Sequence, residues 1–356
     1  MGLGTEGRRP EDARMDVVTQ GVIGAALAQA CAPAERQRIA ALAGAAGGLL
    51  PDADVLIRSA EDPLLGLEFH RHFTHSLVAI PFGGLLAATL VWLLLRLRVS
   101  WRQLVLPATL GWATHGLLDA CTSYGTHLTW PFDDERAAWN VISILDPLFT
   151  LPLLWGCIRG ARRRTRLAPA VGLGVALAYL GLCTVQHARA VVLQGKLWHA
   201  RGHQPIRPEV KPSILNNLVF RSFYEWEGEY WVDAIRVPWW GAMSVHEGER
   251  HPVLDAESLI ERFELDEVQR RDLERFRHFS DGFLIEDRRH EGVVGDFRYA
   301  AVPDSVAPLW GIRVDGLAPG EHVRFERFST LDERMRMRFV DLLLGRVEGD
   351  PVAREP

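Results

Sequence analysis

Glu68-Phe69-His70-Arg71-His72-Phe73-Thr74-His75-Ser76 stands directly before an apolar run from Leu77 to Leu95. Three histidines, one arginine and two hydroxyl groups therefore lie at the mouth of a hydrophobic segment. Nineteen residues without a charge are long enough for a membrane-spanning helix, and imidazole rings are common metal ligands. This stretch predicts metal ligands at a membrane surface, with further ligands on neighbouring helices.

The composition differs between the two halves of the chain. The averages, 48% apolar and 24% charged residues with a net charge of −5, are those of an ordinary soluble protein. Residues 17–187 are rich in Leu, Ala, Gly and Val, whereas residues 188–356 are dense in Arg, Glu, Asp and aromatic residues. We therefore expect a membrane half and a water-soluble half. The second half has no basic stripe, so we expect no nucleic-acid binding.

Apolar segments recur throughout the first half. Two shorter segments rich in Gly and Ala precede four longer ones, and the small residues at 44–48 suit close helix packing. The first fourteen residues have no apolar period, which predicts disorder. The four cysteines form no Cys-x-x-Cys pair, which argues against a zinc ribbon. The apolar segments are residues 17–31, 39–50, 77–95, 104–121, 141–158 and 167–185.

The second half alternates strand-like and helix-like patterns. Glu227-Gly228 between two aromatic runs predicts a hairpin turn, residues 266–279 predict an amphipathic helix, and residues 330–344 predict a closing helix capped by Ser329 or Thr330. The expected fold class is an α-helical multi-pass membrane domain followed by a small α+β soluble domain. The expected parts are a disordered N-terminus (1–14), a membrane-embedded helical domain with the metal site (15–187), the soluble domain (188–350) and a tail (351–356).

The distribution of arginine predicts the orientation. The loops 32–38, 96–103 and 159–166 carry ten arginines, and the segments on the other side carry six. Because cytoplasmic loops are enriched in basic residues, the arginine-rich loops are expected inside and the C-terminal half in the periplasm.

Metal-capable side chains of the first half gather at one depth under this orientation. An ionisable group in a membrane helix is costly and usually faces a partner or a water-filled cavity. His115 and Asp119 are four residues apart and so share one helix face. Asp16 falls in the same layer, and His72 is set aside as a solvated neighbour. The predicted ligands, all on the outer side, are Asp52, Asp54, His70, His75, His115, Asp119 and Asp146.

Imidazole and carboxylate ligands suit a divalent metal ion, zinc foremost, with manganese or iron as alternatives. Without cysteine among the candidates, an open catalytic site is favoured over a closed structural one. Such a metal lowers the pKa of a bound water, and a carboxylate that is not used as a ligand could serve as a general base. Asp54 is predicted as a catalytic residue as well as a candidate ligand. Arg71 is predicted to hold a phosphate or the charge that develops on it.

Each candidate also has a purely structural explanation. A histidine in a membrane helix is often an interhelical hydrogen-bond partner, and His115 with Asp119 fits that description. Asp52 and Asp54 after Pro51 fit a helix-ending turn. Asp146-Pro147 fits a helix start, and Asp16 fits an N-cap. The shared depth of all the candidates is what favours the metal site.

Several motifs of residues 15–185 resemble one known family. They are Asp16-(x)2-Thr19, Leu50-Pro51-Asp52-Ala53-Asp54, His70-Arg71-(x)2-Thr74-His75-Ser76, His115-(x)2-Leu118-Asp119 and Asp146-Pro147. These are similar to the bacterial LexA-regulated, inner-membrane metal-dependent hydrolases. The resemblance implies a multi-pass inner-membrane hydrolase, distant kinship with zinc-dependent phospholipase C, and the seven metal ligands named above. One departure is Gln20, where family members often have a histidine.

These observations together predict a metal-dependent hydrolase of the bacterial inner membrane. The expected substrate is a membrane lipid or other phosphoester at the outer face, which the site's position and Arg71 favour. The alternative is a non-catalytic metal-binding scaffold or transporter whose soluble domain binds a partner. The sequence leaves the oligomeric state open.

Overall fold

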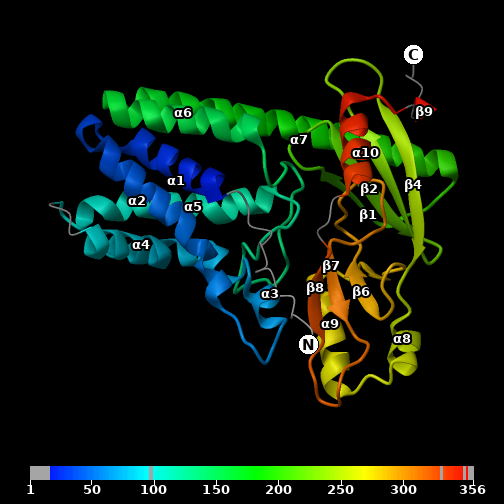
Figure 1. Cartoon of the computed structure of the whole chain (residues 1–356). Helices are drawn as coiled ribbons and strands as arrows, with labels where there is room; N and C mark the ends of the chain where they lie inside the picture. Colours follow the sequence, from blue (N-terminus) through cyan, green and yellow to red (C-terminus); the bar gives the residue numbers. More distant parts are fainter. Residues whose placement is uncertain (1–16, 96–98, 329–331, 348–349, 352–356) are drawn as a thin grey trace, which may run out of the picture. The chain divides into compact units, whose positions relative to one another are not determined.

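The structure, a computed structural model, describes residues 17–95, 99–328, 332–347 and 350–351. It divides into two compact units, each built from separate stretches of the chain (Figure 1). The first unit contains the described residues up to Leu50, Ile80–Asp119 and Pro147–Ala176, and the second contains Pro51–Ala79, Ala120–Asp146 and the described residues from Leu177 onward. The predicted disordered N-terminus, Asp16 and residues 352–356 of the predicted tail lie outside the described residues.

The helices of the N-terminal half follow the apolar runs of the sequence. The last helix continues far beyond the run at 167–185, and α6 begins later than expected because Pro147 takes its first position. In chain order these elements are α1 (Val17–Cys31), α2 (Gln37–Leu49), the 3-10 segment η2 (Leu50–Leu56), α3 (Leu65–Phe69), the 3-10 segment η3 (Phe73–His75), α4 (Ala79–Leu95), α5 (Arg102–Cys121), α6 (Pro147–Arg163) and α7 (Leu167–Arg201).

Glycines bring α1, α2 and α5 into backbone contact in the first unit. A Cβ atom at Gly111 would lie 2.0 Å from the carbonyl oxygen of Gly44, and one at Gly47 would lie 2.1 Å from that of Ala108. Gly24 and Gly44 approach each other in the same way. The close helix packing predicted for residues 44–48 is therefore confirmed.

The predicted fold class, a multi-pass helical membrane domain followed by a small α+β domain, was wrong. Within the described residues, two helical stretches are long and apolar enough to cross a membrane, Ala34–Leu56 and Leu167–Arg201, and the bent pair Leu65–His75 with Ala79–Leu94 makes at most a third. The other apolar runs form helices such as α1, whose 15 residues rise only about 23 Å, less than the hydrocarbon core of about 30 Å. The C-terminal part is rich in β-sheet instead.

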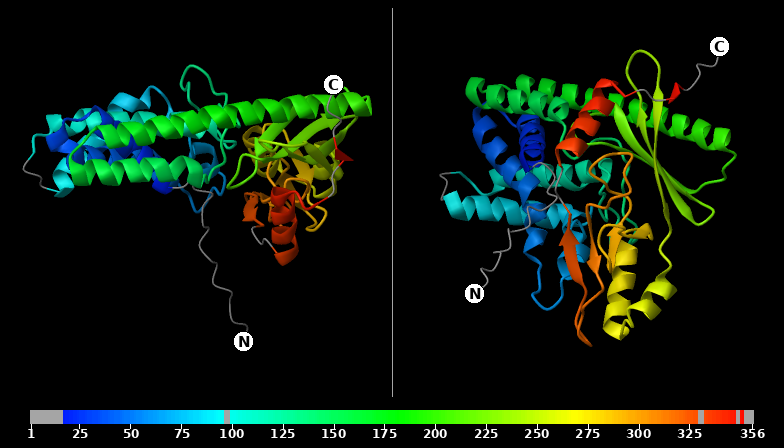
Figure 2. Two further views of the ribbon diagram at one scale, coloured as in Figure 1. Left: turned by 90° about the horizontal axis from the view of Figure 1, so that it is seen from above. Right: turned by 45° about the vertical axis from the view of Figure 1, so that its right-hand side comes forward.

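Two antiparallel sheets build the C-terminal part of the second unit. The first has the strand order β1-β2-β3-β4-β9, and Ala190 and Leu193 of α7 pack on its core residues, with α7 running along the sheet (Figure 2). The second has the order β5-β6-β7-β8, and α9 lies against it (Figure 1). The elements are β1 (Ile206–Pro212), β2 (Val219–Trp226), β3 (Glu229–Arg236), β4 (Ser244–Pro252), α8 (Ala256–Arg262), α9 (Glu267–Phe279), β5 (Leu284–Glu286), β6 (Val293–Asp296), β7 (Trp310–Arg313), β8 (Arg324–Arg327), α10 (Glu333–Leu344) and β9 (Asp350–Pro351).

Local signals of this part are mostly confirmed. Glu227 and Gly228 have φ angles of 51° and 77° and join β2 to β3 as the predicted hairpin turn. Asp266 caps α9 with a capping box, because its side chain and that of Gln269 each bond the other's backbone. The closing helix begins later than predicted, since Asp332 is its N-cap, whereas Ser329 and Thr330 lie outside the described residues.

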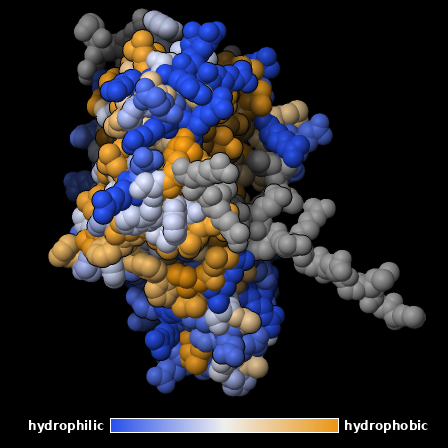
Figure 3. All heavy atoms as spheres, turned by 90° about the vertical axis from the view of Figure 1, so that its left-hand side faces the viewer, coloured by the Kyte–Doolittle hydropathy of each residue, from blue (hydrophilic) through white to orange (hydrophobic). Residues whose placement is uncertain are grey.

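Large apolar side chains remain on the surface of the helical segments. Phe82 on α4 is 70% exposed, and Leu106, Leu151 and Val175 on other helices are also exposed. The face seen in Figure 3 shows such orange side chains beside blue hydrophilic ones. Exposed apolar surface of this extent is unfavourable in water and favourable against lipid.

Candidate metal centre

Asp54 organises the polar stretch from which the sequence analysis began. It is 3% exposed and lies in η2. Its Oδ2 accepts a hydrogen bond of 2.7 Å from the Arg71 backbone amide and one of 3.3 Å from the Thr74 hydroxyl, while its Oδ1 lies 3.0 Å from Nδ1 of His70. A carboxylate with these three partners points toward the loop between α3 and η3 and fixes its conformation.

His75 is held so that one ring nitrogen faces a second carboxylate. Its Nδ1 is 2.9 Å from the Thr74 hydroxyl, which donates its own proton to Asp54. Nδ1 therefore donates to the Thr74 hydroxyl, which leaves the other ring nitrogen, Nε2, to face a different group. That Nε2 lies 3.5 Å from Oδ1 of Asp52.

His115 on α5 shows the same arrangement. Its Nδ1 is 2.7 Å from the carbonyl oxygen of Gly48, which can only accept, so Nδ1 carries a proton. Nε2 lies 3.5 Å from Oδ2 of Asp119. Both side chains are fully buried. Metal-binding histidines commonly donate one ring N–H to a backbone carbonyl oxygen in this way.

Gln20, where the resembled family often has a histidine, has a role that the sequence analysis did not assign. Its amide nitrogen donates a 2.7 Å hydrogen bond to Oδ1 of Asp119. This contact orients the carboxylate so that the other oxygen, Oδ2, is the one that faces His115. Gln20 therefore positions a candidate ligand through a hydrogen bond and is not itself a ligand. In the sequence, Gln20 stood out only as a departure from the resembled family.

The ligand distances fit a tetrahedral ion. Two groups bound at about 2.0–2.1 Å to a tetrahedral zinc ion lie about 3.3–3.4 Å apart, and the two imidazole–carboxylate pairs lie at 3.5 Å. Octahedral magnesium would bring neighbouring ligands to about 3.0 Å. Asp52 with His75 in the second unit and His115 with Asp119 in the first unit each combine an imidazole and a carboxylate. Within the second unit, the described residues His72, His127 and Asp134 form a group that could hold a metal ion.

The remaining predicted site residues have other surroundings. Arg71 is 1% exposed, and its guanidinium lies 4.8 Å over the ring of Tyr124 and donates to the Thr122 hydroxyl. Asp146 accepts a 2.8 Å hydrogen bond from the Tyr179 hydroxyl. His70 faces Asp54 rather than either group of potential ligands. Their predicted roles as ligands or substrate contacts stay predictions.

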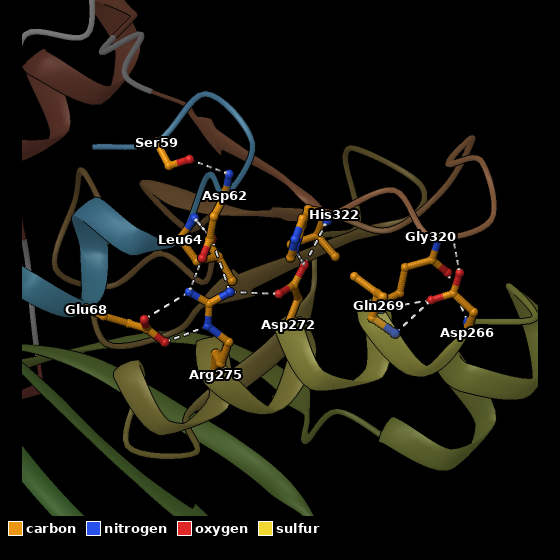
Figure 4. A network of polar contacts seen from close by, with 12 residues as sticks. Ser59, Asp62, Leu64, Glu68, Asp266, Gln269, Asp272, Arg275, Gly320 and His322 are labelled. Atoms are coloured by element: carbon orange, nitrogen blue, oxygen red, sulfur yellow. Dashed lines mark hydrogen bonds and ion pairs between the residues drawn. The ribbon is translucent and has the colours of Figure 1, made fainter. Parts of the chain in front are cut away.

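Arg275 of α9 fixes the segment that precedes the histidines. Its guanidinium bonds both oxygens of Glu68 and both oxygens of Asp62, at 2.6–3.1 Å (Figure 4). It also bonds Asp272, whose other oxygen lies 2.7 Å from Nδ1 of His322. Glu68 is two residues before His70, so the β-rich part of the second unit holds the ligand-bearing loop in place.

Comparison with known proteins gives one match. Residues 15–190 match the model of the YdjM inner membrane protein family. No curated protein and no solved structure matches the chain. Residues 15–190 are thus similar to inner membrane proteins, and together with the apolar helices the match supports a membrane location. The hydrolase activity and the phospholipase C kinship implied by the sequence resemblance go beyond this description.

Proposed function

We propose that this chain, whose residues 15–190 share the YdjM inner membrane family model, is a membrane-embedded zinc hydrolase. Its metal ligands in this proposal are Asp52, His75, His115 and Asp119. The observation that carries it is the pair of imidazoles that each have one ring nitrogen on a hydroxyl or a backbone carbonyl oxygen and the other 3.5 Å from a carboxylate oxygen. A zinc ion would be coordinated by the imidazole and the carboxylate of each pair.

The covalent chain supports placing these ligands on one ion. Ala34–Leu56 is a single helical stretch, and Asp52 lies four residues after Gly48, whose carbonyl oxygen holds His115. His75 in turn contacts Asp52.

The side chains of the chain then have distinct tasks. Asp54 and Thr74 hold Nδ1 of His75, and Gln20 holds Asp119, so the ligand atoms are positioned before a metal binds. A zinc ion bound there lowers the pKa of a coordinated water and supplies a nucleophile near neutral pH. The substrate we propose is a lipid or other phosphoester, because the ligands end apolar helices that present exposed side chains such as Phe82.

Metal analysis of the detergent-purified full chain tests the site. We expect bound zinc in the wild type and about one equivalent less in the variant that combines His75→Ala with His115→Ala. His199→Ala is the matched control, because this exposed ring bonds only its own helix at Gly195 among the contacts that the structure describes. Absence of metal from the wild type, or equal zinc in the double variant and the wild type, would sink the proposal.

A substrate screen separates an enzyme from a scaffold. The zinc-loaded protein should hydrolyse a chromogenic phosphodiester or a phospholipid in mixed micelles, and activity should fall at least about 100-fold in Asp52→Asn, as for loss of a catalytic metal. If the protein binds zinc but hydrolyses neither substrate, it is a non-catalytic metal-binding membrane protein rather than an enzyme. Activity that survives His75→Ala would count against the ligand loop as the active site.

We also propose a periplasmic location for the β-rich part, since the arginine-rich segment 159–166 directly precedes the spanning stretch Leu167–Arg201. Alkaline phosphatase, which folds only in an oxidising compartment, should be active when fused after Gly202 and inactive when fused after Arg163. The reverse pattern of activity would move the site to the cytoplasmic face.

A further inference from the structure

Three side chains outside the proposed hydrolase site gather in the second unit. His72 follows α3, and His127 and Asp134 lie in the loop between α5 and α6. One ligand atom of each lies within 4.8 Å of the other two. The sequence analysis set His72 aside and did not consider His127 or Asp134 as ligands. Folding alone brings the loop that carries His127 and Asp134 next to His72.

The distances in this group match those of a tetrahedral ion. Nε2 of His72 lies 3.5 Å from Oδ1 of Asp134, and Nδ1 of His127 lies 3.4 Å from the same oxygen. Neighbouring ligands of tetrahedral zinc lie about 3.3–3.4 Å apart. Two imidazoles with one carboxylate favour zinc over magnesium or calcium, which prefer oxygen ligands.

Buried nitrogen atoms give a second and independent indication. His127 is 6% exposed, and within the described part of the chain its buried Nδ1 has no hydrogen bond. An unsatisfied buried polar atom costs about 1–3 kcal/mol, and a metal ion would remove that cost.

The backbone at Arg71 points the two neighbouring histidines to different partners. Arg71 has a φ of 60°, the left-handed region, and its carbonyl oxygen accepts from the Thr126 hydroxyl and the His127 amide. His70 therefore meets Asp54, while His72 meets Asp134. The rings of His72 and His127 lie 4.7 Å apart, so the two ligands are arranged by the fold.

We propose that His72, His127 and Asp134 bind a second zinc ion, distinct from that of the hydrolase site. Asp134 is the exposed member, with 67% of its side chain accessible, so solvent completes the coordination on that side. His278 of α9, whose Nε2 lies 4.0 Å from Oδ2 of Asp134, is the nearest further histidine to this carboxylate among the described contacts. This ion would tie the loop after α5 to the ligand-bearing loop after α3.

Zinc stoichiometry of the full chain in detergent tests this site with zinc alone as the probe. We expect His127→Ala and Asp134→Asn each to lose about one equivalent, whereas the combination of His75→Ala with His115→Ala retains that equivalent. Asp133→Asn, an adjacent exposed carboxylate that accepts only from the Glu135 amide among the described contacts, is the matched control and should keep the wild-type content.

The two proposals fail separately in this experiment. If the hydrolase site binds no metal, the wild type holds one equivalent, and Asp134→Asn removes it. Because Asp134 is exposed, this variant should fold even if His127→Ala does not. Equal zinc content in Asp134→Asn and the wild type would overturn the second site. Cobalt(II) bound to the double variant should show the strong visible absorption of tetrahedral coordination, and weak octahedral bands would also contradict it.

Discussion

Replacing Gly111 by alanine is expected to destabilise the first unit by about 1–3 kcal/mol. A Cβ atom there would lie 2.0 Å from the carbonyl oxygen and 2.8 Å from the carbonyl carbon of Gly44, both backbone atoms that no rotamer change can move. The helices α2 and α5 must therefore separate. The helix propensity of alanine, about 1 kcal/mol better than that of glycine, offsets only part of this cost.

Thermal unfolding in detergent measures the effect of Gly111→Ala. Gly174→Ala is the control, because no described atom lies within 4 Å of a Cβ atom built at that helical position. Its midpoint should equal or slightly exceed that of the wild type, while Gly111→Ala should unfold several degrees lower. His115 is on the same helix and bonds Gly48 of α2, so zinc binding should weaken in parallel. Equal midpoints of the two variants would refute the close contact.

Replacing Arg275 by methionine is the second large effect that we expect. Methionine keeps the apolar stem but removes a guanidinium that holds Asp62, Glu68 and Asp272 together (Figure 4). Asp272 has no exposed side-chain area, so its carboxylate stays buried beside His322 without its strongest partner. Loss of one partner of a buried pair costs about 3–5 kcal/mol, and the partial exposure of Glu68 reduces this to about 2–3 kcal/mol.

Arg262→Met is the matched control for this variant. Arg262 also bonds both oxygens of one carboxylate, Glu286, but its side chain is 48% exposed, and such pairs contribute about 0–1 kcal/mol. Arg275→Met should lower the unfolding midpoint by roughly 5–10 °C and Arg262→Met by much less. Arg275→Met should also weaken zinc binding, because Glu68 precedes His70. If Arg275→Met lowers the stability but leaves the zinc affinity unchanged, Arg275 has only a structural role.

The effect of Arg275 should depend on pH in a defined direction. Burial acts to raise the pKa of Asp62, but the hydrogen bond and the charge of Arg275 outweigh it and hold that pKa below its ordinary value. A carboxyl group of lowered pKa contributes stability that is present above its ordinary pKa of about 4 and lost as the pH falls through the lowered value. The stability difference between Arg275→Met and the wild type should therefore shrink below about pH 4.

Local signals in the sequence predicted much of the secondary structure. The apolar runs predicted α4, α5 and α7, Glu227-Gly228 predicted a hairpin, and Asp266 began the expected amphipathic helix. Each of these depends on residues a few positions apart. The number of membrane spans was overestimated, because an apolar run shows only that its residues are hydrophobic. It does not show that α1 is a helix too short to span that packs against α2.

The sequence by itself determined which chemical groups the site contains and that they lie beside apolar helices. His75, His115 and Asp119 stood out as polar side chains in or next to apolar segments, where burial is costly without a partner. The tertiary structure decided which carboxylate each ring faces. It also decided that Gln20 positions Asp119 and that His72 meets His127. The physical reason is that hydrogen-bond direction and contact between residues more than fifty positions apart arise only when the chain folds, whereas the cost of burying a polar group is a property of each residue.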